Sequence, residues 1–267
     1  MYINDFIFKC PIETGGFSTV WKVEYKKKEY ALKMISKHER STKIEKKMLK
    51  TEIKIHKELY HKNIIKMYNS FEDNFYVYIL LELAEDDLFN IFLKNDYILS
   101  LNDVLKIAYQ IIEGLIYLNS KNIVHGDIKM ENILLVNNQY KICDFGLASS
   151  GFYHYNFVGT PEFMAPEIIK HHIYDTKVDI WSLGIIMYDL LYGHSPFTVY
   201  VNNIKYGTID RKLTENAICN KELTFPEPEQ ENNQINTLLK RCLEKDPKKR
   251  ISLNELLNHE LFNNISK

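Results

Sequence analysis

Apolar and polar residues alternate along the first part of the chain. From residue 5 to residue 35, Val, Tyr, Trp and Phe alternate with polar side chains, and the runs break at Gly15-Gly16 and at Lys26 to Lys28. A period of two between turn residues predicts three antiparallel strands, with the lysines in a solvated hairpin turn. Residues 64–83 repeat the pattern around Glu72 to Asn74, which predicts two more strands.

Elsewhere the apolar residues recur at helical spacing. Residues 178–193 are apolar on most sides, which predicts a central buried helix. Ser252 precedes the last helical pattern and is a plausible N-cap. The other predicted helices cover residues 44–59, 101–121, 233–247 and 252–262.

Together these patterns predict an α+β fold with two lobes. A small β-rich N-lobe with one main helix covers residues 1–83, and a larger α-helical C-lobe covers residues 84–267. The hinge is expected near residues 82–86, and the cleft between the lobes is a usual place for a ligand. No repeat or low-complexity linker interrupts this single domain.

Composition narrows the class of protein. The chain has 267 residues, 45% of them apolar, and a net charge of -1, so nothing overall indicates binding to nucleic acid or to an anionic membrane. The longest apolar-rich segment, around residues 179–193, contains two Asp and is shorter than the roughly 20 residues that span a bilayer. Asp5 and the lack of a long apolar stretch argue against an N-terminal signal peptide.

The four cysteines lie far apart and form no C-x-x-C pair, which argues against a zinc site or a disulfide framework. We therefore expect an intracellular, reducing location, cytoplasmic or nuclear or both, and a monomer.

Two residues of the N-lobe are candidates for holding phosphates. Lys33 lies on the third predicted strand, and Glu52 lies 19 residues later on the predicted helix. A strand lysine and a helix glutamate can pair, and the pair then holds the ammonium toward a nucleotide. Taken singly, each is more often an ordinary surface residue. Gly15-Gly16 is equally common in plain hairpin turns.

The stretch "IVHGDIKMEN", residues 123–132, has the spacing of a phosphoryl-transfer loop. Asp127 can accept the proton of an attacking hydroxyl, and Lys129 can neutralise charge on the transferred group. Asn132 offers a side-chain oxygen to a metal. Asp144 follows a strand-like segment and, with that amide oxygen, suits Mg²⁺, which takes few protein ligands and keeps phosphate oxygens.

These motifs occur together in one order, and the whole chain resembles a eukaryotic protein kinase catalytic domain. Lys129 resembles the serine/threonine branch. The resemblance implies ATP and Mg²⁺ as cofactors and proteins as substrates. In chain order, the motifs are the glycine-rich loop, Lys33, Glu52, His125/Asp127/Asn132, Asp144-Phe145-Gly146 and Ala165-Pro166-Glu167.

The resemblance also implies roles for further residues. Leu81 is expected at the back of the ATP pocket, and the backbone of Glu82 and Ala84 is expected to bond adenine. Thr160 is expected to brace Asp127 and Lys129. The remaining nucleotide contacts implied are Ile12, Gly15 and Gly16 in the loop and Val20, Ala31 and Leu134 around the ring. The structural roles implied are a Glu167–Arg250 ion pair, an Asp179 bond to the catalytic loop, and a stack of Met67, His56, Phe145 and His125.

Several positions depart from the family pattern. Glu13 and Ser18 replace glycines of the phosphate loop, and Glu13 is expected to weaken ATP binding somewhat. Gly126 stands where most protein kinases carry Arg, which makes this a non-RD kinase and also resembles aminoglycoside and choline phosphotransferases. Lys129 and the Ala-Pro-Glu motif favour a protein kinase. A pseudokinase scaffold is the other alternative, although every charged group that transfer requires is present.

Residues 49–83 are similar to Aurora and Polo-like cell-cycle kinases. Because the chain ends at residue 267, we expect a stand-alone kinase without a polo-box region. Basic residues are expected before the target hydroxyl. The acids that would receive them are Glu131, Asp189 and Asp86 or Asp87, which are as readily explained as solvated or structural groups.

Gly126 cannot bind an activation-segment phosphate, and Asn156 occupies the place of the phosphorylated Thr in Aurora and Polo kinases. We therefore expect a kinase that is active as made or controlled by a protein partner. Packing of aromatic rings was the expected means of ordering the segment. Those rings are Phe152, Tyr153, Tyr155 and Phe157, and the residues that modification could still reach are Ser149, Ser150, Tyr153 and Tyr155.

Overall fold

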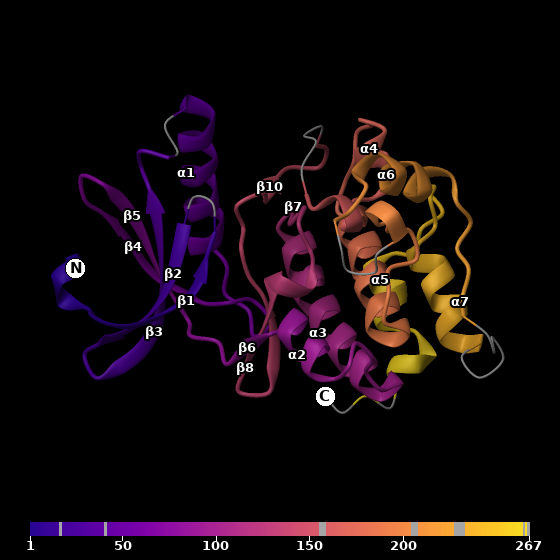
Figure 1. Cartoon of the computed structure of the whole chain (residues 1–267), viewed down its shortest axis with the longest axis horizontal. Coiled ribbons are helices and arrows are strands. Elements are labelled where there is room, and N and C mark those ends of the chain that lie inside the picture. Colours follow the sequence, from indigo (N-terminus) through magenta and orange to yellow (C-terminus); the bar gives the residue numbers. More distant parts are fainter. Residues whose placement is uncertain are drawn as a thin grey trace.

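The computed structural model describes residues 1–15, 18–39, 42–154, 159–203, 208–226, 233–263 and 265. A β-sheet with one long helix forms one end of the molecule, and a cluster of helices forms the other (Figure 1). The predicted bilobal α+β fold is therefore confirmed.

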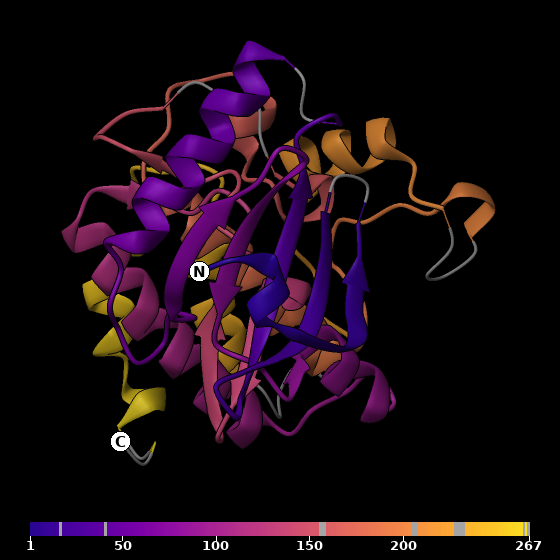
Figure 2. The same ribbon diagram turned by 90° about the vertical axis from the view of Figure 1, so that its left-hand side faces the viewer.

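The N-lobe contains a five-stranded antiparallel sheet of order β1-β2-β3-β5-β4. Its face is seen in Figure 2, where the strands fan out beside the helix α1. The five strands predicted from alternation are all present. They are β1 (Ile7–Thr14), β2 (Ser18–Tyr25), β3 (Lys28–Ser36), β4 (Met67–Glu72) and β5 (Tyr76–Leu81).

The β2–β3 turn confirms the predicted lysine hairpin. Tyr25 pairs with Lys28, so Lys26 and Lys27 alone form the turn. Their φ angles of 50° and 63° lie in the left-handed region, as the two central residues of a type I′ hairpin require. Long side chains adopt this backbone less readily than Gly or Asn, so the register is held by the strands on either side.

The N-lobe helix α1 (Lys43–Lys57) lies within one or two residues of its predicted range. Thr42 and Glu45 form a capping box at its start, with each side chain bonded to the other's backbone. One face of α1 is buried against the sheet, and this face carries Leu49 and Glu52. The helix therefore brings a carboxylate to the inner side of the lobe.

The C-lobe is mostly helical, and its main helices are α3 (Leu101–Ser120) and α5 (Lys177–Tyr192). Short strands carry the loops that face the N-lobe. These are β6 (Asp86–Asp87), β7 (Ile123–Val124), β8 (Ile133–Val136), β9 (Gln139–Ile142) and β10 (Ser149–Ser150). The other α-helices are α2 (Leu88–Lys94), α4 (Pro166–Ile169), α6 (Arg211–Asn220), α7 (Asn233–Cys242) and α8 (Leu253–Leu257). Single 3₁₀ turns occur at Ile3–Asp5, Met130–Asn132, Pro161–Phe163, Val201–Asn203 and Glu260–Phe262.

Helix α5 is central, as its apolar sequence predicts. Every residue from Val178 to Leu190 is buried. The helix ends at Gly193, whose φ of 71° is the left-handed cap that glycine favours. At the end of the chain, Ser252 caps α8 with Glu255 in a second capping box, which confirms the expected N-cap. None of the helices in the described ranges is both long and apolar enough to span a membrane.

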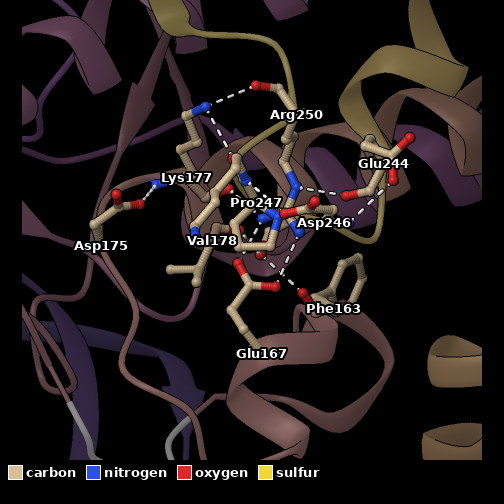
Figure 3. Close-up of polar contacts among 11 residues, drawn as sticks. Phe163, Glu167, Asp175, Lys177, Val178, Glu244, Asp246, Pro247 and Arg250 are labelled. Atoms are coloured by element: carbon tan, nitrogen blue, oxygen red, sulfur yellow. Dashed lines mark hydrogen bonds and ion pairs between the residues drawn. The ribbon is translucent and has the colours of Figure 1, made fainter.

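An ion pair joins α4 to the last loop of the C-lobe. Nη1 and Nη2 of Arg250 donate to the two carboxylate oxygens of Glu167, at 2.7 and 2.9 Å. Arg250 also donates to the carbonyls of Glu244 and Lys177, and its side chain is 0% exposed (Figure 3). Its guanidinium lies 5.2 Å from the ring of Trp181. The expected Glu167–Arg250 pair is confirmed as buried and bidentate.

Candidate active site

Three charged groups meet where β3 faces α1. Lys33 lies on β3, opposite Val20 of β2 and Ile79 of β5. Its ammonium is 2.9 Å from a carboxylate oxygen of Glu52 and 3.0 Å from one of Asp144. The expected Lys33–Glu52 pair is therefore formed, and Asp144 joins it from the C-lobe.

The pKa values of this cluster reflect mutual stabilisation. Burial opposes the charge of Lys33, but Glu52 and Asp144 together raise the pKa of Lys33 well above its ordinary value. Partial burial likewise opposes ionisation of Asp144, yet the nearby ammonium lowers the pKa of Asp144 to about 2. The lysine is therefore a cation and Asp144 an anion at neutral pH.

Asp127 is held in one orientation by its neighbours. Its Oδ1 accepts hydrogen bonds from the backbone N–H and the hydroxyl of Thr160, at 2.9 and 2.8 Å. The amide of Asn132 donates to the backbone carbonyl and to Oδ2 of Asp127, at 2.8 and 3.2 Å. Nζ of Lys129 lies 3.6 Å from the same Oδ2. The four expected residues are thus in contact, with Oδ2 on the side of Lys129.

The backbone before Asp127 is fixed by a buried carboxylate. Asp179 of α5 accepts from the N–H groups of His125 and Gly126, both at 2.9 Å, as expected. Gly126 has a φ of 77°, a conformation that glycine adopts without strain. A Cβ on Gly159 would lie 2.8 Å from the carbonyl oxygen of Gly126, so the loop and the activation segment touch through bare backbone. This close contact places Thr160 on Asp127.

A stack of rings joins the lobes behind these charges. The ring of Phe145 lies 4.7 Å from His56 of α1 and 5.2 Å from His125, centre to centre. His56 is buried, and its Nε2 donates to the carbonyl of Ile65 at 2.7 Å. Burial lowers the pKa of His56 to about 4, so the ring is neutral and serves as packing. Met67, the fourth expected member, packs on the neighbouring apolar cluster of the sheet.

A cleft of about 540 Å³ opens in front of the Lys33 cluster. This volume is in the range of small-molecule and cofactor sites. Gly15 is not among the residues that line it, and Gly16 lies outside the described residues. Asp127 and Thr160 border a smaller hollow beside it. The expected residues that do line the cleft are Ile12, Val20, Ala31, Lys33, Glu52, Leu81, Glu82, Ala84, Lys129, Asn132, Leu134 and Asp144.

The hinge is tied to the C-lobe through Glu82, a contact that the sequence analysis did not foresee. The carboxylate of Glu82 accepts from Nζ of Lys141 on β9, at 2.7 and 2.9 Å. The N–H of Glu82 donates to the carbonyl of Lys66. Within the described part of the chain, the carbonyl of Glu82 and the N–H of Ala84 keep no backbone partner. These two groups suit an adenine edge, as the resemblance implies.

Cys143 lines the same cleft immediately before Asp144. Its N–H donates to the carbonyl of Asn132, and its own carbonyl accepts from Nε2 of His125, both at 2.9 Å. Burial and the adjacent Asp144 raise the pKa of the Cys143 thiol well above its ordinary value. All four cysteines are free thiols.

The donor groups in the cleft fit a magnesium ion. Asp144 keeps 44% of its side chain exposed, although one oxygen contacts Lys33. The N–H₂ group of Asn132 points to Asp127, so its amide oxygen is directed elsewhere. Groups of three or more His, Cys, Asp or Glu that could hold a metal are absent from the described residues. Two hard oxygen donors beside a phosphate-sized space match the few protein ligands that Mg²⁺ takes.

Three acidic residues lie together next to the catalytic loop. Asp189 of α5 is buried, and its Oδ1 has no hydrogen-bond partner within the ranges that the structure covers. Burial, followed by the charges of Glu162 and Glu131, raises the pKa of Asp189 well above its ordinary value. Asp86 and Asp87 are engaged instead, Asp86 with Lys94 and Asp87 as the N-cap of α2. They therefore have structural roles.

The start of the activation segment is held by a histidine. The buried ring of His154 accepts from the hydroxyl of Ser149 at Nδ1, 2.7 Å away, and donates from Nε2 to the carbonyl of Gly151. Its backbone bonds Tyr174 in both directions, at 3.0 and 3.1 Å, and the two rings stack. Ser149 belongs to β10, which pairs with β7. No simple pattern marks His154 in the sequence, because its partners come from a turn and a distant bridge.

The expected ring packing is wrong for two of the four aromatic residues. Phe152 is 72% exposed and Tyr153 69% exposed, because the Ser149–His154 bond closes a short loop that turns both rings outward. Tyr155 and Phe157, like Asn156, lie outside the described residues.

Comparison with known proteins agrees with this geometry. The protein kinase domain family matches residues 8–262. A probable serine/threonine-protein kinase CCRP1 of Zea mays is 38% identical over 94% of this chain and 40% of its own length. A serine/threonine-protein kinase PLK4 of Nematostella vectensis is 33% identical over 98% of the chain and 26% of its own. For a serine/threonine-protein kinase TIO of Arabidopsis thaliana the values are 35%, 97% and 19%. The chain thus spans well under half of these curated relatives.

Proposed function

Because the chain belongs to the protein kinase family, we propose that it transfers the γ-phosphoryl group of ATP to serine or threonine hydroxyls of proteins. The observation that carries the proposal is the convergence of Lys33, Glu52 and Asp144 within 3.0 Å, beside a loop in which Asp127 is already oriented. In kinases, transfer requires both the lysine–glutamate pair and the aspartate in place.

Asp127 acts on the attacking hydroxyl. Thr160 occupies its Oδ1, so Oδ2 is the oxygen that accepts the hydrogen bond, and finally the proton, of the serine or threonine. The Asn132 amide restrains the same side chain from the other side. Because both restraints exist before substrate binds, little reorganisation is needed, and positioning supplies much of the rate.

Two lysines supply positive charge. Lys33 is aimed into the cleft and suits the α- and β-phosphates, whereas Lys129 stands next to Asp127, where charge on the transferred group develops. When bound by Asp144 and Asn132, Mg²⁺ bridges phosphate oxygens and offsets their charge. The side chain of Glu13, at the mouth of the cleft, adds some repulsion toward ATP.

The direct test is phosphoryl transfer from radiolabelled ATP with Mg²⁺ to a generic Ser/Thr protein substrate. Asp144→Asn should remove most of the transfer and leave the circular dichroism spectrum unchanged. Asp175→Asn, which changes a carboxylate near α5, is the matched control and should keep its activity. Near-normal transfer by Asp144→Asn would reject the assignment. Absence of transfer by the native chain would favour the scaffold, and transfer to aminoglycosides or choline the small-molecule alternative.

Within the family, we place the chain with the Polo-like kinases and infer a cell-cycle role inside the cell. The PLK4 proteins among its relatives support the first inference, and the four free thiols are compatible with a reducing compartment. Loss of cell-cycle progression on deletion, restored by the native chain and not by Asp144→Asn, would support this role. Normal progression would reject it.

Control without activation-segment phosphate rests on His154. The Ser149–His154–Tyr174 contacts order the segment where other kinases use an Arg–phosphate pair. His154→Ala should therefore lower turnover by roughly ten-fold, since small misplacements of the loop are costly. Phe152→Ala, at an exposed neighbouring ring, should have little effect. Phosphatase treatment that lowers turnover ten-fold, reversed by rephosphorylation, would contradict this mode of control.

The acidic residues support a preference for Arg or Lys two or three positions before the target. Asp189 offers an unpaired buried carboxylate oxygen, and Glu131 and Glu162 add charge beside it. A guanidinium can satisfy such a carboxylate in a bidentate way. A peptide profile should favour Arg there, and Asp189→Asn should reduce the preference. A profile that favours acidic residues upstream would reject it.

A further inference from the structure

The outer face of α1 carries an uninterrupted stripe of lysines. The six residues of this lysine stripe are Lys43, Lys46, Lys47, Lys50, Lys54 and Lys57. At 3.6 residues per turn, all six fall within an arc of about 100°, along roughly 21 Å of helix. All six are exposed.

Nothing within the described chain neutralises this charge. None of the six lysines forms an ion pair or a side-chain hydrogen bond with another described residue. The two acids of α1 are engaged elsewhere, because Glu45 closes the capping box with Thr42 and Glu52 binds Lys33 on the opposite side of the helix.

The stripe works against the helix that carries it. Pairs such as Lys43–Lys47, Lys46–Lys50 and Lys50–Lys54 lie four residues apart, where like charges repel. Lysines in the first turn also oppose the helix dipole. A solvated helix face more commonly mixes both signs of charge, as far as salt bridges at this spacing allow. The stripe therefore has its most favourable state when an anionic partner covers it.

An apolar edge runs beside the stripe. Ile44 is 73% exposed and Met48 36% exposed, and the two lie one turn apart on the same side of the lysines. A partner that matches this surface has carboxylates in a row and an apolar flank, which describes an acidic amphipathic helix.

We propose that the lysine stripe, with Ile44 and Met48, is a docking surface for an acidic amphipathic helix of a partner protein. A nucleic acid fits less well, because the stripe has no Arg for bidentate contacts and no aromatic residue for stacking. A membrane fits less well, because the larger apolar residues Leu49 and Ile55 face the sheet. Docking would load the helix whose inner face holds Glu52.

The test uses a labelled helix-forming peptide with Glu at helical i, i+3, i+4 and i+7 spacing and two Leu along one edge. A scrambled peptide of the same composition is its control. Fluorescence anisotropy with the full chain should show at least about ten-fold tighter binding of the ordered peptide, weakening as salt rises. This readout does not involve catalysis, so it is independent of whether the chain transfers phosphate.

Variants of the chain locate the surface. The triple change Lys47→Glu, Lys50→Glu and Lys54→Glu should weaken binding of the ordered peptide by at least about ten-fold. It should still fold, because it replaces repelling pairs by attracting ones. Ile44→Ser with Met48→Ser should weaken binding less. A matched triple change at Lys26, Lys27 and Lys28 to Glu should leave it unchanged.

Three results would overturn the proposal. The first is equal affinity for the scrambled peptide, and the second is an equal loss in the hairpin variant, since both would indicate non-specific attraction. The third is tighter binding of a 20-nucleotide single-stranded DNA or of phosphatidylserine vesicles than of the ordered peptide.

Discussion

Two glutamates of this chain pair with a basic residue, and the two pairs differ in almost every other respect. Glu167 and Arg250 are sealed in the C-lobe with two parallel hydrogen bonds and further carbonyl acceptors around the guanidinium. Glu52 and Lys33 share one contact at the edge of a cleft, and the ammonium is divided between Glu52 and Asp144.

The difference indicates what each pair is for. A planar guanidinium with every hydrogen bond satisfied has one stable arrangement, so it fixes the position of α4. A lysine ammonium is a point charge on a flexible stem and can exchange one oxygen partner for another. The first pair is therefore suited to support the fold, and the second to receive phosphate.

Breaking the buried pair should have the largest effect. Arg250→Ala leaves the Glu167 carboxylate buried without a partner, and we expect the free energy of unfolding to fall by about 3–5 kcal/mol. Urea unfolding measures it. Arg211→Ala, which breaks an exposed pair with Glu215, is the control and should cost about 0.5 kcal/mol or less. Equal losses in both variants would remove the distinction.

Breaking the cleft pair should affect activity rather than folding. Lys33→Met removes the charge that meets the phosphates, and kcat should fall by about 10²–10³-fold. Unfolding should change by only about 1 kcal/mol, because Glu52 can turn toward the open cleft or become protonated. Steady-state kinetics and urea unfolding on the same sample give both values. A stability loss as large as that of Arg250→Ala would contradict the comparison.

Acid should act on the α1 side and spare the buried C-lobe pair. The folded pKa of His56 is about 4, below its ordinary 6.5, so folding disfavours its protonation. The stability that depends on neutral His56 is present above pH 6.5 and is lost as pH falls from 6.5 toward 4, by about 3 kcal/mol at most. In His56→Phe this part of the pH dependence should vanish. An unchanged profile in that variant would refute the assignment.

Exchanging the basic residues should give the smallest effect and the sharpest contrast. Arg250→Lys keeps the charge but loses the second hydrogen bond to Glu167, at a cost of roughly 1–3 kcal/mol. Met at the same position, which removes charge and fork together, should cost more. If Arg250→Lys is as stable as the native chain, the bidentate geometry has no value.

Much of the fold follows from periodicity and capping. The alternation around β1 to β5, the all-apolar α5 and the Ser252 cap each produce a local signal that tertiary contacts only reinforce. Helices α2 and α6 give no such signal. In α6 the buried residues are Thr214 and Ile218 while Leu213 is exposed, so the sequence lacks a clear apolar stripe. Such helices form because neighbouring elements offer them a surface.

For the site, family resemblance identified the residues that touch phosphate, because their chemistry constrains both type and spacing. Contacts whose role depends on a distant partner were missed. Lys141 binds the hinge carboxylate of Glu82 across the cleft, and His154 closes its own loop against Ser149. The outward rings of Phe152 and Tyr153 follow from that closure, which ring count alone could not show.

The thiol of Cys143 has a consequence for how the cleft can be attacked chemically. Because its pKa lies well above the ordinary value, almost none of it is thiolate at neutral pH. The thiolate is the reactive nucleophile and the form that peroxide oxidises. Although Cys143 lines the cleft, electrophilic inhibitors should therefore label it slowly, and oxidants should spare it. A cysteine beside Asp144 is in this way compatible with a cleft that stays chemically inert.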